Sequence, residues 1–361
     1  MKMKKFHLIY GFFCLLTAVL AVYSLRAPSL PPPAGEDLSH NQFIKGEVVQ
    51  KQDDNFAVRL QDERGSIIKT KLSEFYIYDD YQAGDKVSVY VTQLEEGGVR
   101  YDIADYYHYD GLLVVFLIFC VMAVLVAKKK GVYSIVSVVL SLLLFYAIVL
   151  NAMKTGISVL PAGIIYVLLI TILTIPMIHG FNKKGLSAII AVNVGYVFGL
   201  ILTYLFTAIV KIGNTPAEDY RILINQFPDI DIRQVLMVSL FLGVVGALID
   251  VAVSICSAIF EGMKEHPDMT FSKTYELGMN VGKDILGSMI NTLLLAYLAA
   301  SMPFLVLMTL ARYNHMIEFM NYDFIALELT RIFIGAASIV LLIPITSVIS
   351  AYLVARKGRL I

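Results

Sequence analysis

Long apolar runs alternate with short charged segments along most of the chain. A helix that crosses a bilayer needs about 20 mainly apolar residues, and its backbone polar groups are then bonded within the helix itself. The runs that meet this condition are 7–25, 111–127, 132–150, 158–178, 186–210, 235–260, 284–311 and 330–354. The pattern predicts a mostly α fold, a polytopic helical membrane bundle of about eight spans.

Between the first two apolar runs, the spacing of apolar residues changes from that of a helix to that of a β-strand. Residues 27–41 form a proline-rich stretch typical of a stiff linker. Residues 42–105 alternate apolar and polar positions in short strand-like segments, FIKGEVVQ, NFAVRLQ, SIIKTKL, KVSVYVTQL and VRYDIA. So short a five-stranded segment has to curl or close to bury one face, which favours a small β-barrel-like (OB-like) domain. An N-terminal transmembrane anchor (1–26) would precede the linker, and a seven-span domain (106–361) would follow the β-domain.

Positive residues predict the orientation of the spans. Lysines and arginines cluster at both ends of the chain, at Lys128–Lys130 and at Lys183–Lys184. All of these lie on one side if the span count is right, and the positive side is cytoplasmic. Both termini are then cytoplasmic and residues 27–110 extracytoplasmic. The first run also resembles a cleaved signal peptide, but its long apolar core and the absence of a clear cleavage site favour an uncleaved anchor.

The amino-acid composition argues against several classes of function. Hydrophobic residues make up 58% of the chain and charged residues 16%, against about 25% charged in soluble domains. The formal net charge of zero argues against a nucleic-acid partner. The cysteines lie in apolar runs and the histidines are scattered, so the sequence predicts no metal site and no cofactor. No nucleophile–base constellation is recognisable, and an enzyme is not expected.

The sharpest chemical signal is Asp250, which stands in the middle of an apolar run. Placing a carboxylate at the centre of a spanning helix costs about 2.5–3.5 kcal/mol, so a polar partner, water or a cation is expected beside it. Residues three, four and seven positions apart share one helix face. On that spacing, the candidates for a proton or cation relay are Asp250, Ser254, Ser257, Ser288, Asn291 and Thr292. A static hydrogen-bonded seam between two spans is the alternative.

Two further polar groups lie near predicted membrane surfaces. Asn280, Lys283 and Asp284 lie at the cytoplasmic mouth of the run 284–311, where anchors and caps are common. Glu328 and Arg331 stand at i and i+3 before the last span, near the outer face. That spacing favours a local ion pair, with a gate as the alternative role.

Three stretches of the sequence resemble the bacterial YibE/F family. They are GALIDVAVSICSAIFE, GMNVGKDILGSMINTLLLAYLAASMPFLVLM and ELTRIFIGAASIVLLIPITSVISAYL. The resemblance implies a predicted permease or transport-associated protein, multi-pass in the bacterial cytoplasmic membrane. More distantly, the order G…D…VS…E before a cytoplasmic helix and a polar span is similar to the proton-relay half of the RND and SecD/SecF exporters. That likeness covers one short motif and implies that Asp250 is the relay residue.

The sequence therefore predicts a membrane permease or transport-associated protein coupled to protons or cations through Asp250. The alternative is a non-transporting scaffold or accessory subunit that binds an envelope partner through the outer β-domain. Expected partners are the lipid bilayer and an unknown substrate or protein at the β-domain, with no nucleic acid. The sequence leaves oligomerisation open.

Overall fold

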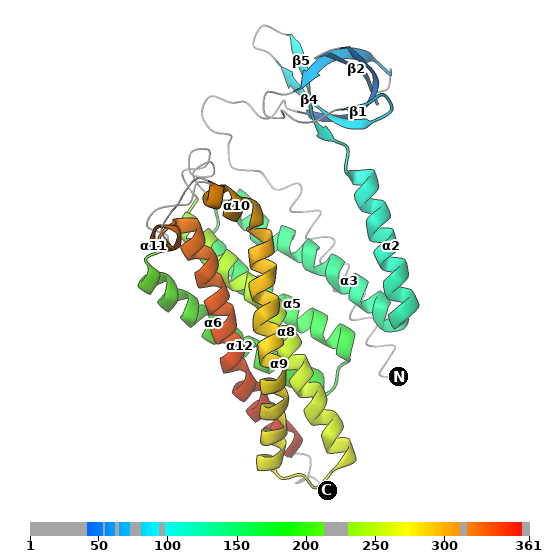
Figure 1. Cartoon of the computed structure of the whole chain (residues 1–361). Coiled ribbons are helices and arrows are strands. Elements are labelled where there is room, and N and C mark those ends of the chain that lie inside the picture. The colour runs from blue at the N-terminus through cyan, green and yellow to red at the C-terminus, as the bar shows by residue number, and fades with distance from the viewer. Residues whose placement is uncertain are drawn as a thin grey trace. The chain divides into compact units, whose positions relative to one another are not determined.

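The computed structural model describes residues 42–52, 55–61, 65–72, 81–93, 98–212, 230–310 and 316–355. They belong to two compact units, one formed by residues 31–131 and the other by the rest of the chain. Figure 1 shows both units, which are described separately below. The predicted anchor (1–26) and linker (27–41) lie outside the described residues.

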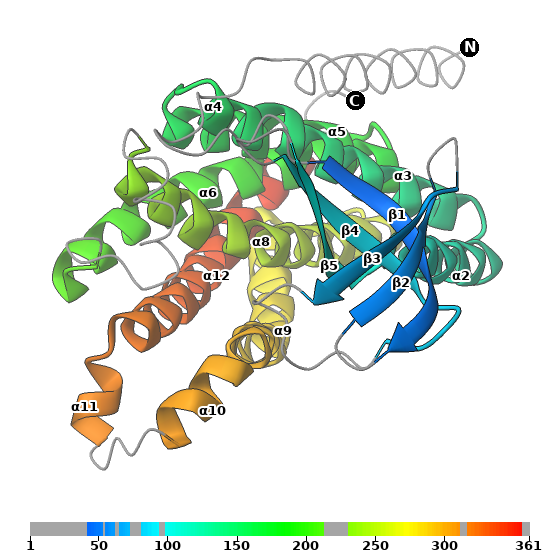
Figure 2. The same ribbon diagram turned by 90° about the horizontal axis from the view of Figure 1, so that it is seen from above.

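The first unit contains the β-domain, and all five predicted strands are confirmed. The strands are β1 (Gln42–Gln52), β2 (Asn55–Leu60), β3 (Ile67–Leu72), β4 (Lys86–Gln93) and β5 (Val99–Tyr106). Their hydrogen bonds run in the closed order β1–β2–β3–β5–β4 and return to β1. Neighbours pair antiparallel except β3 and β5, which are parallel over a short register. Figure 2 shows the strongly curled sheet that results.

The alternation predicted from the sequence produces the core of the β-domain. Val48, Phe56, Val58, Val87 and Ile103 point inward and are at most 2% exposed. They come from four strands, and each is flanked by polar or more exposed neighbours because side chains alternate across a strand. The domain thus has its own hydrophobic cluster, distinct from those of the helical unit.

Helix α2 (Tyr109–Ala127) follows β5 in the same unit, and none of its residues is buried. Its side chains are almost all apolar, which suits a helix that faces lipid on all sides. Lys45 and Lys86 both bind the Asp110 carboxylate, at 3.0 and 2.8 Å, and so join the sheet to the first turn of α2. The hydrogen bond to Asp110 raises the pKa of Lys86.

The second unit is helical. Its elements are α3 (Lys129–Leu144), the π-helical turn η2 (Phe145–Leu150), α4 (Asn151–Lys154), α5 (Val159–His179), α6 (Lys183–Val210), α8 (Ile232–Glu265), α9 (Phe271–Ala300), α10 (Met302–Leu310), α11 (Met316–Met320) and α12 (Asp323–Ala355). Asn182, Asp231 and Thr270 cap α6, α8 and α9 by accepting hydrogen bonds from first-turn backbone N–H groups.

Six helical segments of the described chain are long and apolar enough to cross a membrane. They correspond to six of the eight predicted runs, including 235–260 in α8 and 330–354 in α12. The run 284–311 is divided by Ser301 between α9 and α10, and α9 is not among the six. Its polar positions lower its hydropathy. The run 7–25 lies outside the described residues. The described residues therefore contain six candidate spans, and the predicted count of eight is not confirmed.

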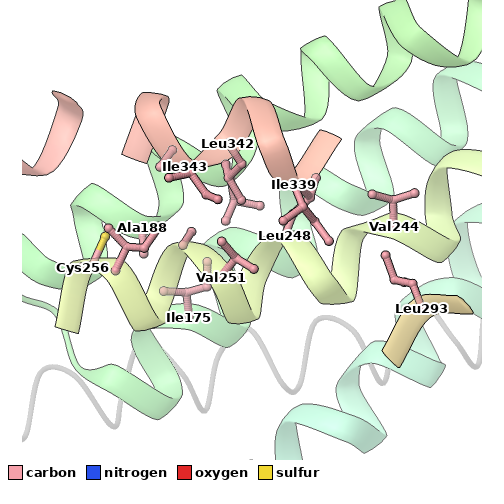
Figure 3. Packing of buried hydrophobic residues seen from close by; sticks show 14 of the residues in the cluster. Ile175, Ala188, Val244, Leu248, Val251, Cys256, Leu293, Ile339, Leu342 and Ile343 are labelled. Atoms are coloured by element: carbon pink, nitrogen blue, oxygen red, sulfur yellow. The ribbon is translucent and has the colours of Figure 1, made fainter. Parts of the chain in front are cut away.

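Helix α8 supplies the largest share of the core, with α6, α9 and α12 packed against it. Figure 3 shows Leu248 and Val251 of α8 facing Ile339 and Leu342 of α12. Glycines bring α6 close to α12, since a Cβ added at Gly195 would lie only 2.5 Å from Leu342 Cδ1. Small residues commonly permit such close helix approach in membranes.

Candidate functional site

One face of α8 is left open by the other described elements. Leu248, Val251 and Ile255 on its opposite face are at most 1% exposed and pack into the core. The open face combines small and polar residues at helical spacing: Gly246, Asp250 and Ser254 are all exposed. An added Cβ at Gly246 would meet nothing within 4 Å, which shows that the face is open at this level.

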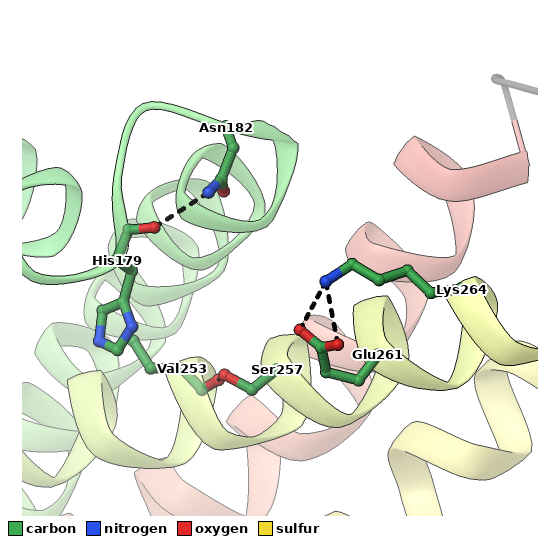
Figure 4. A network of polar contacts seen from close by, with 6 residues as sticks. All are labelled: His179, Asn182, Val253, Ser257, Glu261 and Lys264. Carbon is green, nitrogen blue, oxygen red and sulfur yellow. Dashed lines mark hydrogen bonds and ion pairs between the residues drawn. The ribbon is translucent and has the colours of Figure 1, made fainter. Parts of the chain in front are cut away.

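Asp250 has no hydrogen bond and no ion pair with any described residue. Ser254, one turn further on, likewise has no described partner, although both side chains are exposed. Ser257 is half-buried and donates its hydroxyl hydrogen to Val253 O at 2.6 Å, as Figure 4 shows. The Asp250 carboxylate is therefore not part of a hydrogen-bonded seam between the described helices.

The predicted polar residues of α9 also lie on an exposed face. Ser288 donates to Ile285 O and Thr292 donates to Ser288 O, each at 2.8 Å, so both hydroxyls bond within their own helix. Asn291 is exposed and has no hydrogen-bond partner among the described residues. The same holds for the group predicted at the helix mouth, namely Asn280, Lys283 and Asp284.

The close neighbours of two α8 glycines show which residues of α8 and α9 lie at the same depth along the two helices. A Cβ at Gly243 would collide with the Tyr297 hydroxyl, and one at Gly262 would lie 2.9 Å from Leu277 Cδ2. Because α8 and α9 are antiparallel neighbours joined by a short turn, interpolation places Asp250 level with the α9 turn that contains Ser288. The two predicted sets thus share a depth, but no described hydrogen bond joins them.

Glu328 and Arg331 form the expected ion pair on α12, with Nη1 and Oε1 2.5 Å apart. Their side chains are only 13% and 16% exposed, so the pair is more buried than a surface pair. The Arg331 guanidinium carbon lies 5.5 Å from the centre of the Tyr297 ring of α9. Tyr297 thus joins α12 to α9 beside Gly243 of α8, a role that its sequence position did not reveal.

A second cluster that sequence reasoning missed is fully buried. The hydroxyl oxygens of Ser187 and Ser350 lie 2.7 Å apart, and Cys256 Sγ lies 3.3 Å from the Ser350 oxygen. These residues come from α6, α12 and α8, so the cluster joins three helices. Asn193 of α6 likewise donates a hydrogen bond to the Thr171 hydroxyl of α5 at 3.0 Å. Only knowledge of which helices pack together could have paired these residues.

Comparison with protein families accounts for most of the chain. A family model described as YibE/F-like protein matches residues 115–356, which span α2 to α12. The chain belongs to the YibE/F family. Comparison with curated proteins and with solved structures gave no match. The matched residues include Asp250, the polar face of α9 and the Glu328–Arg331 pair, whereas the β-domain lies before them.

The β-domain unit holds a hollow of its own, about 750 Å³ in volume, beside the start of α2. Polar and aromatic groups line one part of it, among them Lys86, Tyr107 and His108. Leu112 and Val115 of α2 line another part. An open hollow lined by polar and apolar groups suits a ligand or peptide that carries both kinds of group.

Proposed function

We propose that this YibE/F family member is a transport-type protein of the bacterial cytoplasmic membrane, in which the open face of α8 lines a water-filled path. Asp250 is the proton- or cation-binding group of the path. Ser254 and Ser257 extend the polar face along α8, and Ser288, Asn291 and Thr292 of α9 lie at a similar depth. Both termini are cytoplasmic in this proposal, and residues 27–110 are extracytoplasmic.

The main support for this proposal is the position of Asp250 in the middle of an apolar helix, where its side chain is exposed and has no described partner. A carboxylate left in hydrocarbon would cost several kcal/mol, about 2.5–3.5 on the insertion scale. A structural role would have to recover that cost through bonds to neighbouring helices, and none of the described helices supplies one. Water or a cation on the open face removes the cost and is also what transport requires.

Ion flux into vesicles tests the proposal. The full chain in proteoliposomes should carry a proton or sodium flux driven by an imposed potential, and Asp250→Asn should reduce this flux to the protein-free level. The matched control is Glu261→Gln on the same helix, because Glu261 is exposed and already paired with Lys264 at 2.9 Å. That variant should keep the flux. Full flux in folded Asp250→Asn would overturn the assignment.

The hollow beside Lys86 supports a second candidate function. The chain would then be an accessory subunit that binds an envelope partner or ligand through the β-domain. The closed strand order, with its one parallel pair between β3 and β5, is consistent with an OB-like barrel, a fold that binds ligands on its sheet and loops.

Removing the β-domain discriminates between the two functions. A chain with residues 42–104 deleted should keep some ion flux if the helices form a self-sufficient path. Complete loss of flux in a deletion variant that still inserts, together with capture of an envelope protein by the isolated β-domain, would favour the accessory role.

A further inference from the structure

The outward face of α9 repeats at the spacing of a coiled coil. Counting from Asn280, steps of four and three residues alternate along the helix and give Asn280, Asp284, Gly287, Asn291, Leu294 and Leu298. All are exposed except Leu294, which is half-buried. The side of α9 that packs on α8 and α12 carries Gly278, Gly282 and Leu293 instead. A seam of alternating three- and four-residue steps is the pattern by which one helix packs along another.

We infer that a second copy of this chain docks on this face, with α9 of one copy against α9 of the other. Two copies inserted in the same orientation are related by a two-fold axis along the membrane normal, so the two α9 helices run parallel. Each seam residue then meets its own counterpart, and the contact closes on itself. The inference goes beyond the proposed function and does not depend on transport, and it assigns Asn291 to the contact between copies and not to the path along α8.

Asn291 is the first reason for choosing a second copy as the occupant. Its amide has no described partner, and an amide carries both donors and acceptors. In a parallel pair, two copies of Asn291 face each other and can hydrogen-bond across the axis. Such polar pairs promote helix association in membranes, and an asparagine in a coiled-coil seam fixes register and copy number.

Charge complementarity is the second reason. A seam side chain enters a hole formed by four residues of the facing helix. For Asp284 that hole consists of Asn280, Lys283, Asp284 and Gly287 of the other copy, so the two lysines flank and offset the two carboxylates that meet across the axis. Because the dimer is symmetric, the contact between Lys283 of one copy and Asp284 of the other forms twice. Lys283 and Asp284 have no described ion pair within their own chain, and the dimer supplies one.

Gly287 allows the two helices to approach. An added Cβ at this position meets nothing within 4 Å of its own chain, so the glycine is not required by the described fold. Placed between Asp284 and Asn291 in the seam, it removes the side chain where the helices would be closest.

Disulfide trapping in vesicles tests the contact. The purified full chain, with Cys14, Cys120 and Cys256 replaced by alanine, is reconstituted and oxidised after introduction of Gly287→Cys or Leu294→Cys. Both variants should form covalent dimers. Thr292→Cys is the matched control, because Thr292 is exposed on the same helix but lies outside the seam. No dimer with either seam cysteine, or equal trapping at Thr292, would overturn the inference.

Substitutions that alter the seam chemistry provide a second measurement. Asn291→Leu should weaken association about tenfold in a dilution series counted by single-molecule photobleaching, whereas Thr292→Leu should leave it unchanged. Asp284→Lys should weaken association, and the swapped pair Lys283→Glu with Asp284→Lys should restore it. Unchanged association in Asn291→Leu, or no rescue by the swap, would contradict the assigned packing.

Discussion

At the scale of single residues, three intramembrane polar sites differ in the hydrogen-bond or ion-pair partners that their side chains have. Glu328 and Arg331 bind each other, and the Ser187–Ser350–Cys256 cluster is bonded internally. Asp250 alone of these groups is exposed and has no described partner. The first two sites are explained by helix packing, whereas Asp250 requires water, an ion or another chain.

Breaking the Glu328–Arg331 pair should be costly. Arg331→Met leaves the Glu328 carboxylate largely buried without a counter-ion and should lower the free energy of unfolding by about 3–5 kcal/mol. Lys264→Met is the matched control, since Glu261 and Lys264 form an i,i+3 pair with side chains 60% and 71% exposed. That change should leave the free energy of unfolding nearly unchanged, because solvent screens an exposed pair.

Equilibrium unfolding in detergent measures both variants. Adding Glu328→Gln to Arg331→Met should recover part of the lost stability, because the amide no longer needs a counter-ion. An Arg331→Met variant as stable as Lys264→Met would show that the ion pair does not contribute to the fold.

At the scale of elements, hydropathy was enough to find most of the structure. The period-two segments became β1 to β5 because each needs one buried face, and six apolar runs became long helices. The polarity of α9 separates it from the other helices. The directions of the helix faces could not be predicted, because spacing shows that Asp250 and Ser254 share a face but not whether that face meets another helix. The pairing of Tyr297 with Arg331 was unpredictable for the same reason.

The contact between α6 and α12 yields a prediction at this scale. Gly195→Leu places a side chain where Leu342 already lies, so it should destabilise the helical unit by about 1–3 kcal/mol. Gly246→Leu on α8 should have little effect, because an added Cβ there meets nothing within 4 Å. Thermal unfolding of both variants measures the difference, and equal midpoints would contradict the close approach of α6 and α12.

At the scale of the whole molecule, the two units have separate hydrophobic cores. Phe56→Ala should destabilise the β-domain by about 3–5 kcal/mol, and Leu248→Ala should destabilise the helical unit by about 2–5 kcal/mol, because each leaves a cavity in its own core. Amide hydrogen exchange should show faster exchange in β2 to β4 for the first variant and in α8 for the second. Equal loosening of both units by either change would show that they fold as one.

The central claim is that the open face of α8 is in contact with water inside the membrane. The most direct measurement is the reaction of a single cysteine with a charged, water-soluble thiol reagent in intact vesicles. With the three native cysteines replaced by alanine, Ser254→Cys is compared with Val197→Cys, an apolar position of α6 that is 53% exposed in the structure. Thiolates form in water and not in hydrocarbon, so Ser254→Cys should react about 100-fold faster. Equal, slow reaction at both positions would show that lipid or another chain covers the face and that Asp250 does not line a path.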